Sequence, residues 1–96
     1  MPGIVRIYDT HIGHSGSNVP FHKTYYAKGS SNVFANGRNV IRRGDKCACG
    51  DPAVGCSSTV FANNIPVHRK NDSTGGHGSW VPNANETASD NVLVDS

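Results

Sequence analysis

The sequence predicts a small all-β domain: three β-hairpin repeats with pseudo-threefold symmetry, joined by long loops. Composition is the first reason, because Asn, Gly and Ser supply 31 of the 96 residues. Helical bundles and coiled coils instead need Ala, Leu, Glu and Lys in quantity. An internal repeat and the His and Cys content of the loops are the other two reasons. With 35% hydrophobic residues in so short a chain, we expect only a marginal core that needs further stabilisation.

Charge and hydropathy exclude several classes of partner. The formal net charge of +2 is too small to predict nucleic-acid binding. The basic cluster lacks the interleaved aromatic residues of a nucleic-acid platform and is expected to be a solvated face; it comprises Arg38, Arg42, Arg43 and Lys46. No apolar run approaches a membrane span, and the N-terminus has no signal-peptide hydrophobic region. We therefore expect synthesis in a reducing cytoplasm, where the three thiols act as ligands or stay free.

The internal repeat predicts the first two hairpins. Residues 31–45 align without gaps on residues 58–72, at an offset of 27 throughout. Each copy is typical of a strand, a tight turn and a second strand. Asn36-Gly37 is the strongest short-range hairpin signal, and Asn63-Asn64 can adopt the same turn less comfortably.

A third copy is split between the two ends of the chain. Residues 90–94 resemble the first strand of the repeat, and residues 4–9 resemble the second. Pairing them would close the chain around a pseudo-threefold axis. We thus expect one domain over 1–96, with its repeats at about 29–45, 56–72 and 88–96 plus 3–9. Equivalent positions are expected to form local ion pairs or turn-fixing hydrogen bonds: Arg6 with Asp9, Arg42 with Asp45, and Arg69 with Asp72.

The loops carry the chemistry-bearing residues. Three loops, 9–29, 45–57 and 72–89, contain every Cys and every His except one. His14 and His77 follow the aspartate that opens their loops by the same distance, and Cys49 comes one position earlier. Threefold symmetry would bring these three side chains together near the axis. Imidazole with thiolate is a ligand set that Zn²⁺ prefers, and a fourth ligand would complete a tetrahedral site.

His22 is our choice for that fourth ligand, with His11 and Cys47 as the alternatives. His68 lies beside Arg69 on an expected strand and is interpreted as a sheet-surface residue. Cys56 occupies a strand start and is interpreted as a packing residue. No loop shows a nucleophile with an orienting partner, and four ligands favour a closed structural site over a catalytic one, so we expect no enzyme.

The repeat unit resembles the PAAR-repeat family, although the Pro-Ala-Ala-Arg signature is degenerate at residues 39–42 and 66–69. The resemblance extends over nearly the whole chain. Its most specific segments are residues 29–37, 43–45, 57–61, 67–69 and 73–80. It implies a small pointed cone of β-hairpins with a metal near the apex, typically zinc, held by three His and one Cys. The matching positions are His14, His22, Cys49 and His77, which favours His22 over His11; iron is the alternative metal.

The resemblance also implies a function. Family members cap the trimeric β-helical spike of contractile phage tails and type VI secretion systems and sharpen the tip that breaches the target envelope. A pseudo-threefold monomer offers three similar faces to such a trimer, so we expect one copy per trimer. We therefore expect a structural protein at the tip of a virion tail spike, made in the host cytoplasm, or of a secretion spike. The alternative is a small metal-dependent hydrolase or effector module that acts on the envelope.

Overall fold

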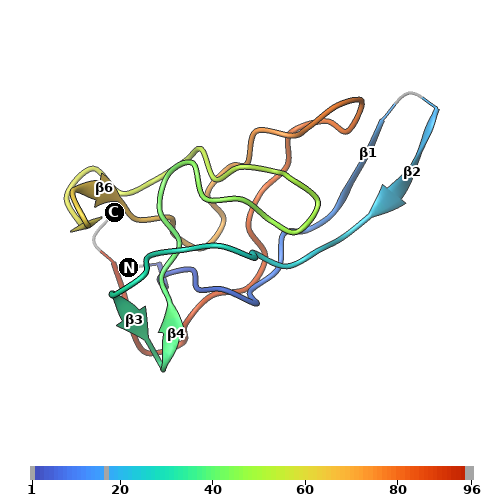
Figure 1. The fold of residues 1–96 in the computed structure, drawn as a ribbon. Coiled ribbons are helices and arrows are strands. Elements are labelled where there is room, and N and C mark those ends of the chain that lie inside the picture. The colour runs from blue at the N-terminus through green and yellow to red at the C-terminus, as the bar shows by residue number, and fades with distance from the viewer. Residues whose placement is uncertain (1, 17, 95–96) are drawn as a thin grey trace.

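A computed structural model describes residues 2–16 and 18–94 of the chain. All regular structure in these residues is short antiparallel β-structure, as the sequence predicted (Figure 1). Three two-stranded sheets are formed by β1 (His14–Gly16) with β2 (Val19–His22), β3 (Phe34–Ala35) with β4 (Arg38–Asn39), and β5 (Phe61–Ala62) with β6 (Ile65–Pro66). Isolated bridges join much of the remaining chain. None of these residues forms a helix long and apolar enough to cross a membrane.

The hairpins β3–β4 and β5–β6 form at the two predicted turns. Asn36 and Gly37 have φ angles of 54° and 75°, and Asn63 and Asn64 have φ angles of 55° and 64°. Positive φ at both central residues matches the right-handed twist of the flanking strands. Asparagine tolerates this conformation better than most residues, so Asn63-Asn64 makes the turn without glycine.

A closed ring of backbone hydrogen bonds joins the three predicted repeats. The Val5 amide donates to the His68 carbonyl (3.1 Å), the His68 amide donates to the Ile41 carbonyl (2.9 Å), and the Ile41 amide donates to the Val5 carbonyl (2.9 Å). Each repeat thus contributes one donor and one acceptor at the same sequence position.

Val5 belongs to the N-terminal part of the repeat that is split between the two ends of the chain. The C-terminal part joins it through bonds from the Ile4 amide to the Val92 carbonyl (2.9 Å) and from the Val94 amide to the Pro2 carbonyl (2.8 Å). Residues 95 and 96 of that predicted repeat lie outside the described residues.

The expected ion pairs are confirmed at all three equivalent positions. Each arginine Nε donates to the aspartate three residues later: Arg6 to Asp9 at 2.9 Å, Arg42 to Asp45 at 2.9 Å, and Arg69 to Asp72 at 2.7 Å. The same carboxylates accept the arginine's own backbone amide at 2.8 Å. Each pair therefore fixes the tight turn from which a long loop begins.

The turn asparagines also lock neighbouring repeats together. Asn36 Oδ1 accepts hydrogen bonds from Ser89 Oγ (2.7 Å) and Arg6 Nη1 (3.0 Å) in the repeat formed by the chain ends. Asn63 Oδ1 accepts one from Ser30 Oγ at 2.6 Å in the preceding repeat. An asparagine at this position thus serves both the turn and the contact between repeats.

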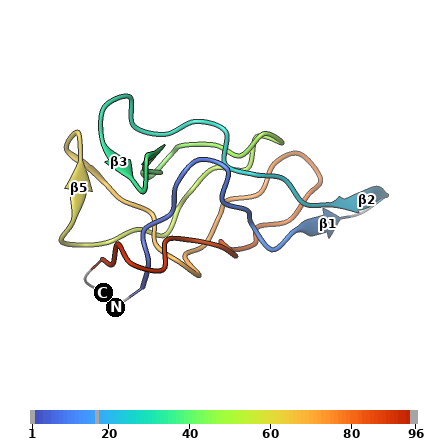
Figure 2. The same cartoon turned by 90° about the horizontal axis from the view of Figure 1, so that it is seen from below.

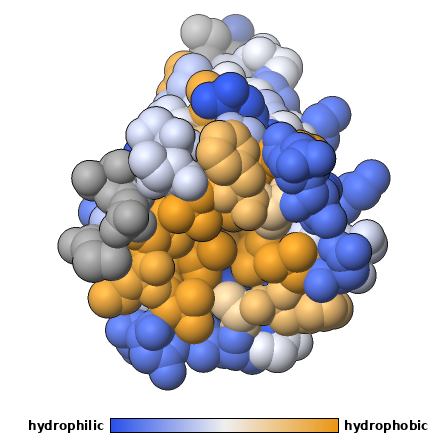
Figure 3. Space-filling model, turned by 90° about the vertical axis from the view of Figure 1, so that its left-hand side faces the viewer, coloured by the Kyte–Doolittle hydropathy of each residue, from blue (hydrophilic) through white to orange (hydrophobic). Residues whose placement is uncertain are grey.

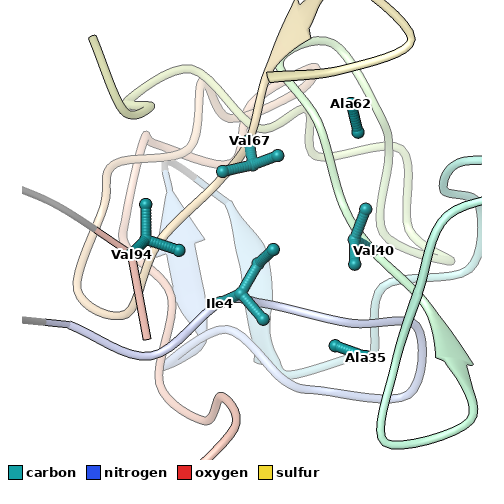
Figure 4. Close-up of a cluster of buried hydrophobic side chains, with 6 residues drawn as sticks. All are labelled: Ile4, Ala35, Val40, Ala62, Val67 and Val94. Carbon is teal, nitrogen blue, oxygen red and sulfur yellow. The ribbon is translucent and has the colours of Figure 1, made fainter. Parts of the chain in front are cut away.

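The core has two layers that follow the repeat. The first cluster takes two aliphatic residues from each repeat: Ile4, Ala35, Val40, Ala62, Val67 and Val94 (Figure 4). The second contains Val5, Tyr26, Ile41, Cys47 and Ala53, with Cys49 packed at its edge. The two alanines of the first layer, Ala35 and Ala62, occupy equivalent positions in the hairpins β3–β4 and β5–β6.

The molecule is elongated, with extents of 38 × 23 × 22 Å. The β3–β4 and β5–β6 hairpins and the paired residues Gly3 and Leu93 lie at one end, and β1–β2 extends from the other (Figures 1 and 2). We call the first end the base, defined by β3 to β6 and residues 92–94, and the second end the apex, defined by residues 12–16, 18–22, 47–50 and 75–82.

The interpretation of His68 as a surface residue is wrong. His68 is fully buried at the ring position equivalent to Val5 and Ile41. Its Nδ1 donates to the Gly55 carbonyl (2.6 Å), and the Tyr26 hydroxyl donates to its Nε2 (2.9 Å). The repeat equates the position with apolar residues, and both ring nitrogens are satisfied by polar groups, which allows histidine to replace an aliphatic residue here.

This burial predicts a pH dependence of stability. Desolvation lowers the pKa of His68 below its ordinary value of 6.5, so the unfolded chain binds a proton that the folded chain excludes. Stability should therefore be lost as the pH falls below about 6.5, by up to about 1.4 kcal/mol per pH unit for this one proton. The His68→Gln variant should be less stable at neutral pH and show a shallower loss, measured by urea unfolding from pH 7.5 to 5.5. Parallel curves for the two proteins would contradict the assignment, because all other titrating groups are shared.

Candidate metal centre

The four predicted ligand residues come from three separate loops and meet at the apex. His14 opens β1 and His22 closes β2, and the two residues face each other in the register of this hairpin. Cys49 lies in a turn closed by a hydrogen bond from the Gly50 amide to the Cys47 carbonyl (2.8 Å). His77 lies between two glycines with positive φ, in a turn that pairs it with Trp80.

The ligand atoms converge closely enough for one metal ion. The Nε2 atoms of His14 and His22 are 2.6 Å apart, those of His22 and His77 are 3.2 Å apart, and all four ligand atoms, including Cys49 Sγ, lie within 4.8 Å of one another. Tetrahedral zinc, with bonds of 2.0–2.1 Å to nitrogen and 2.3 Å to sulfur, would place its ligand atoms about 3.3 to 3.6 Å apart. The four residues therefore fit a bound metal if their side chains shift by less than about 1 Å.

Hydrogen bonds orient the candidate ligand atoms toward the position that a metal would occupy. His14 Nδ1 donates to the Val81 carbonyl at 2.6 Å, which leaves the Nε2 lone pair free for a metal. The Thr24 hydroxyl donates to Cys49 Sγ at 3.2 Å and so helps to orient that sulfur atom. Burial, together with the neighbouring imidazoles of His14 and His77, lowers the pKa of His22. A neutral imidazole is the form that binds a metal.

Trp80 covers the two outer imidazoles. Its ring stacks on His22 with a centroid distance of 4.7 Å and on His77 with a distance of 5.0 Å. Its Nε1 donates to the Pro20 carbonyl at 2.8 Å, which ties the β1–β2 hairpin to the loop that carries His77. Trp80 thus shields the half-buried side of the site and limits the orientations of both rings.

The two alternatives for the fourth ligand, Cys47 and His11, are outside the group of four converging ligand atoms. Cys47 is buried in the second core layer, and its burial raises the pKa of the thiol, which therefore stays protonated. His11 lies next to the site, with its Nε2 3.7 Å from Cys49 Sγ. However, His11 Nδ1 is within 3.0 Å of Asn83 Oδ1, and its Nε2 accepts from the Thr24 amide (3.0 Å), so both ring nitrogens are engaged.

Sequence reasoning missed two polar residues that support this site. The buried Asp51 and the half-buried Asn83 lie behind the ligands and join the loops through their side chains. Their spacing matches no metal motif, and neither is part of the internal repeat. The sequence offered one signal for Asp51. Each of the three turn aspartates has an arginine three residues before it, whereas Asp51 has none.

The fold and site together define a class: a small β-hairpin protein whose loops converge on a candidate metal centre at one end. The sequence profile of the PAAR motif matches residues 5–55, which are 51 of the 96 residues. The chain belongs to the PAAR motif family, whose members are spike-tip-type proteins of contractile injection systems. The matched region contains His14, His22 and Cys49 but ends before His77. Comparisons with curated proteins and with solved structures return no significant match.

Removal of the metal should destabilise the protein, because the metal would tie together three loops from distant parts of the sequence. We expect about one metal ion per chain by elemental analysis, and a lower melting temperature after complete chelation. The Cys49→Ser variant should bind zinc at least about tenfold more weakly, since it loses one of four ligands. Fluorescence of Trp80, the only tryptophan, would report metal loading.

Cys56→Ser is the matched control, because Cys56 is a half-buried thiol outside the group of ligands. Its zinc affinity should equal that of the wild-type protein. An unchanged melting temperature after complete metal removal would show that the metal does not hold the loops.

Proposed function

We propose that the protein is a structural spike-tip protein that caps the trimeric β-helical spike of a contractile injection machine and aids its passage through the target envelope. The observation that carries this proposal is an apolar base built from equivalent residues of the three repeats. Phe34, Phe61 and Leu93 are 56%, 55% and 49% exposed. Each precedes a small buried core residue in its repeat: Ala35, Ala62 and Val94, respectively.

These side chains belong to one face of the molecule. Figure 3 views the base and shows a broad apolar surface at its centre, with polar residues around much of its edge. Val33 and Val92, which precede Phe34 and Leu93, are also exposed at 36% and 37%. Contiguous apolar surface of this kind is typical of a protein-protein contact.

The symmetry of the base suggests the geometry of its partner. A monomer with three similar faces can make the same contact with each subunit of a threefold trimer, so one copy would suffice per spike. The partner would also cover the short strand edges of β3 to β6, which are otherwise open to pairing with other chains. A trimeric β-helix offers such a threefold end.

The surface of the apex is uncharged and partly apolar, which suits passage through an envelope. Residues 10–22, 47–50 and 73–85 include no Asp, Glu, Lys or Arg. Ile12, Phe21 and Val81 are about half exposed or more there. Charged groups are costly to move into hydrocarbon, so an uncharged tip lowers that cost.

We propose zinc as the bound ion, in a structural role. Three imidazole nitrogens and one thiolate suit tetrahedral zinc, and a closed shell leaves no position for a reacting water. When bound, the metal would supply a rigid cross-link between three loops at the point that bears the load. Elemental analysis of the purified protein would distinguish zinc from iron. In a phage the protein would lie at the tip of the virion tail, and in a bacterium at the tip of a secretion spike.

Mixing the protein with a trimeric β-helical spike fragment tests this function. We expect a complex with one chain per trimer by size-exclusion chromatography with light scattering. Phe34→Asp and Phe61→Asp should each weaken binding at least about tenfold, because a charge would replace a buried aromatic contact. Phe21→Asp is the matched control at the apex and should bind the spike normally. No complex at micromolar concentrations of both proteins would overturn the proposal.

A further inference from the structure

A buried carboxylate lies directly behind the candidate metal centre. Asp51 is fully buried, and its oxygens accept three hydrogen bonds. Oδ2 accepts from Thr74 Oγ1 (2.7 Å) and Asn83 Nδ2 (2.7 Å), and Oδ1 accepts from the Gly76 amide (2.6 Å). All three donors belong to the loop that carries His77.

Asp51 also faces a second ligand. Its Oδ2 lies 3.9 Å from Nδ1 of His14, on the side of that ring away from the other ligands. The Gly76 amide that it binds immediately precedes His77. One side chain from the loop of Cys49 therefore fixes the backbone beside His77 and borders the ring of His14.

A second metal site at this position is disfavoured by its hydrogen bonds. His11, His14 and Asp51 are all buried, with potential ligand atoms within 4.8 Å of one another. Yet His14 Nδ1 already donates to the Val81 carbonyl, and both Asp51 oxygens accept from the donors described above. A metal bound by His11, His14 and Asp51 would have to break these hydrogen bonds. We therefore interpret this cluster as support for the metal centre of His14, His22, Cys49 and His77.

The charge of Asp51 needs a counterion. Burying a carboxylate is costly unless an opposite charge compensates it. Over residues 2–16 and 18–94, no Lys or Arg nitrogen lies within 4.0 Å of the Asp51 carboxylate. The only ion-pair contact of Asp51 at that distance is with His14. A divalent metal bound by one thiolate carries a net charge of +1, which Asp51 would bring to zero.

We propose that Asp51 is the positioning and charge-balancing residue of the metal centre: it orients the segments of His14 and His77, and its negative charge strengthens metal binding. This inference rests on the metal centre of the proposed function but not on the spike. It also explains how an apex without exposed charge can hold a dication, since the compensating charge is buried beneath the ligands.

Zinc affinity, measured by competition with a chromophoric chelator on the full chain, tests the inference. Asp51→Asn keeps the size of the side chain but removes its charge, and we expect the zinc affinity to fall ten- to a hundredfold, as for other residues that support metal ligands. Asp90→Asn is the control for the loss of one negative charge, because Asp90 is an exposed aspartate outside the candidate groups of metal ligands. Its affinity should stay within threefold of wild type. Equal affinities of wild type and Asp51→Asn, or equal losses in the two variants, would overturn the inference.

A second variant separates charge from folding. Asp51→Glu keeps the negative charge in a longer side chain, so its zinc affinity should exceed that of Asp51→Asn even if both variants are less stable. The absorption spectrum of the cobalt-loaded proteins would show whether the ligands keep their arrangement; we expect a changed spectrum for Asp51→Asn and a wild-type spectrum for Asp90→Asn. An affinity of Asp51→Glu no higher than that of Asp51→Asn would contradict the role of charge. Wild-type protein that binds no zinc would instead refute the metal centre itself, whatever the spike assay shows.

Discussion

The rest of the structure depends on the ring of three hydrogen bonds that joins Val5, Ile41 and His68. A chain with so little apolar content cannot hold three hairpins together by burial alone. The ring makes each repeat donate to one neighbour and accept from the other, so the ends of the chain become part of the same closed structure. The ring also separates the hairpins from the long loops. The hairpins β3–β4 and β5–β6 extend from the ring toward the base, and the long loops extend toward the apex.

This arrangement explains how residues far apart in the sequence form one site. His14, Cys49 and His77 each follow a turn held by an arginine-aspartate pair, and the three turns are equivalent. Loops that start from equivalent points and run in one direction must meet near the axis. The buried Asp51 then joins the loop of Cys49 to the loop of His77. Trp80 joins the loop of His77 to the β1–β2 hairpin, which carries His14.

Much of this could be predicted because the sequence repeats itself. The turns at Asn36 and Asn63 and the ion pairs followed from equivalent positions in the repeat. The convergence of His14, Cys49 and His77 followed from their similar distances after the turn aspartates, whereas His22 has no repeat equivalent and was favoured by the family resemblance. What could not be predicted departs from the repeat. His68 replaces an aliphatic residue, and its burial depends on Tyr26 and Gly55, which lie far away in the sequence. Asp51 has no repeat equivalent, and its role depends on three donors from another loop.

The central claim is that the apex holds a closed, four-coordinate metal centre. X-ray absorption at the zinc edge of the metal-loaded protein tests it most directly, because it reports the number and type of ligand atoms. We predict three nitrogens at about 2.0–2.1 Å and one sulfur at about 2.3 Å. A five- or six-coordinate shell that includes a water oxygen, or a shell without sulfur, would contradict the claim and would favour a metal-dependent hydrolase.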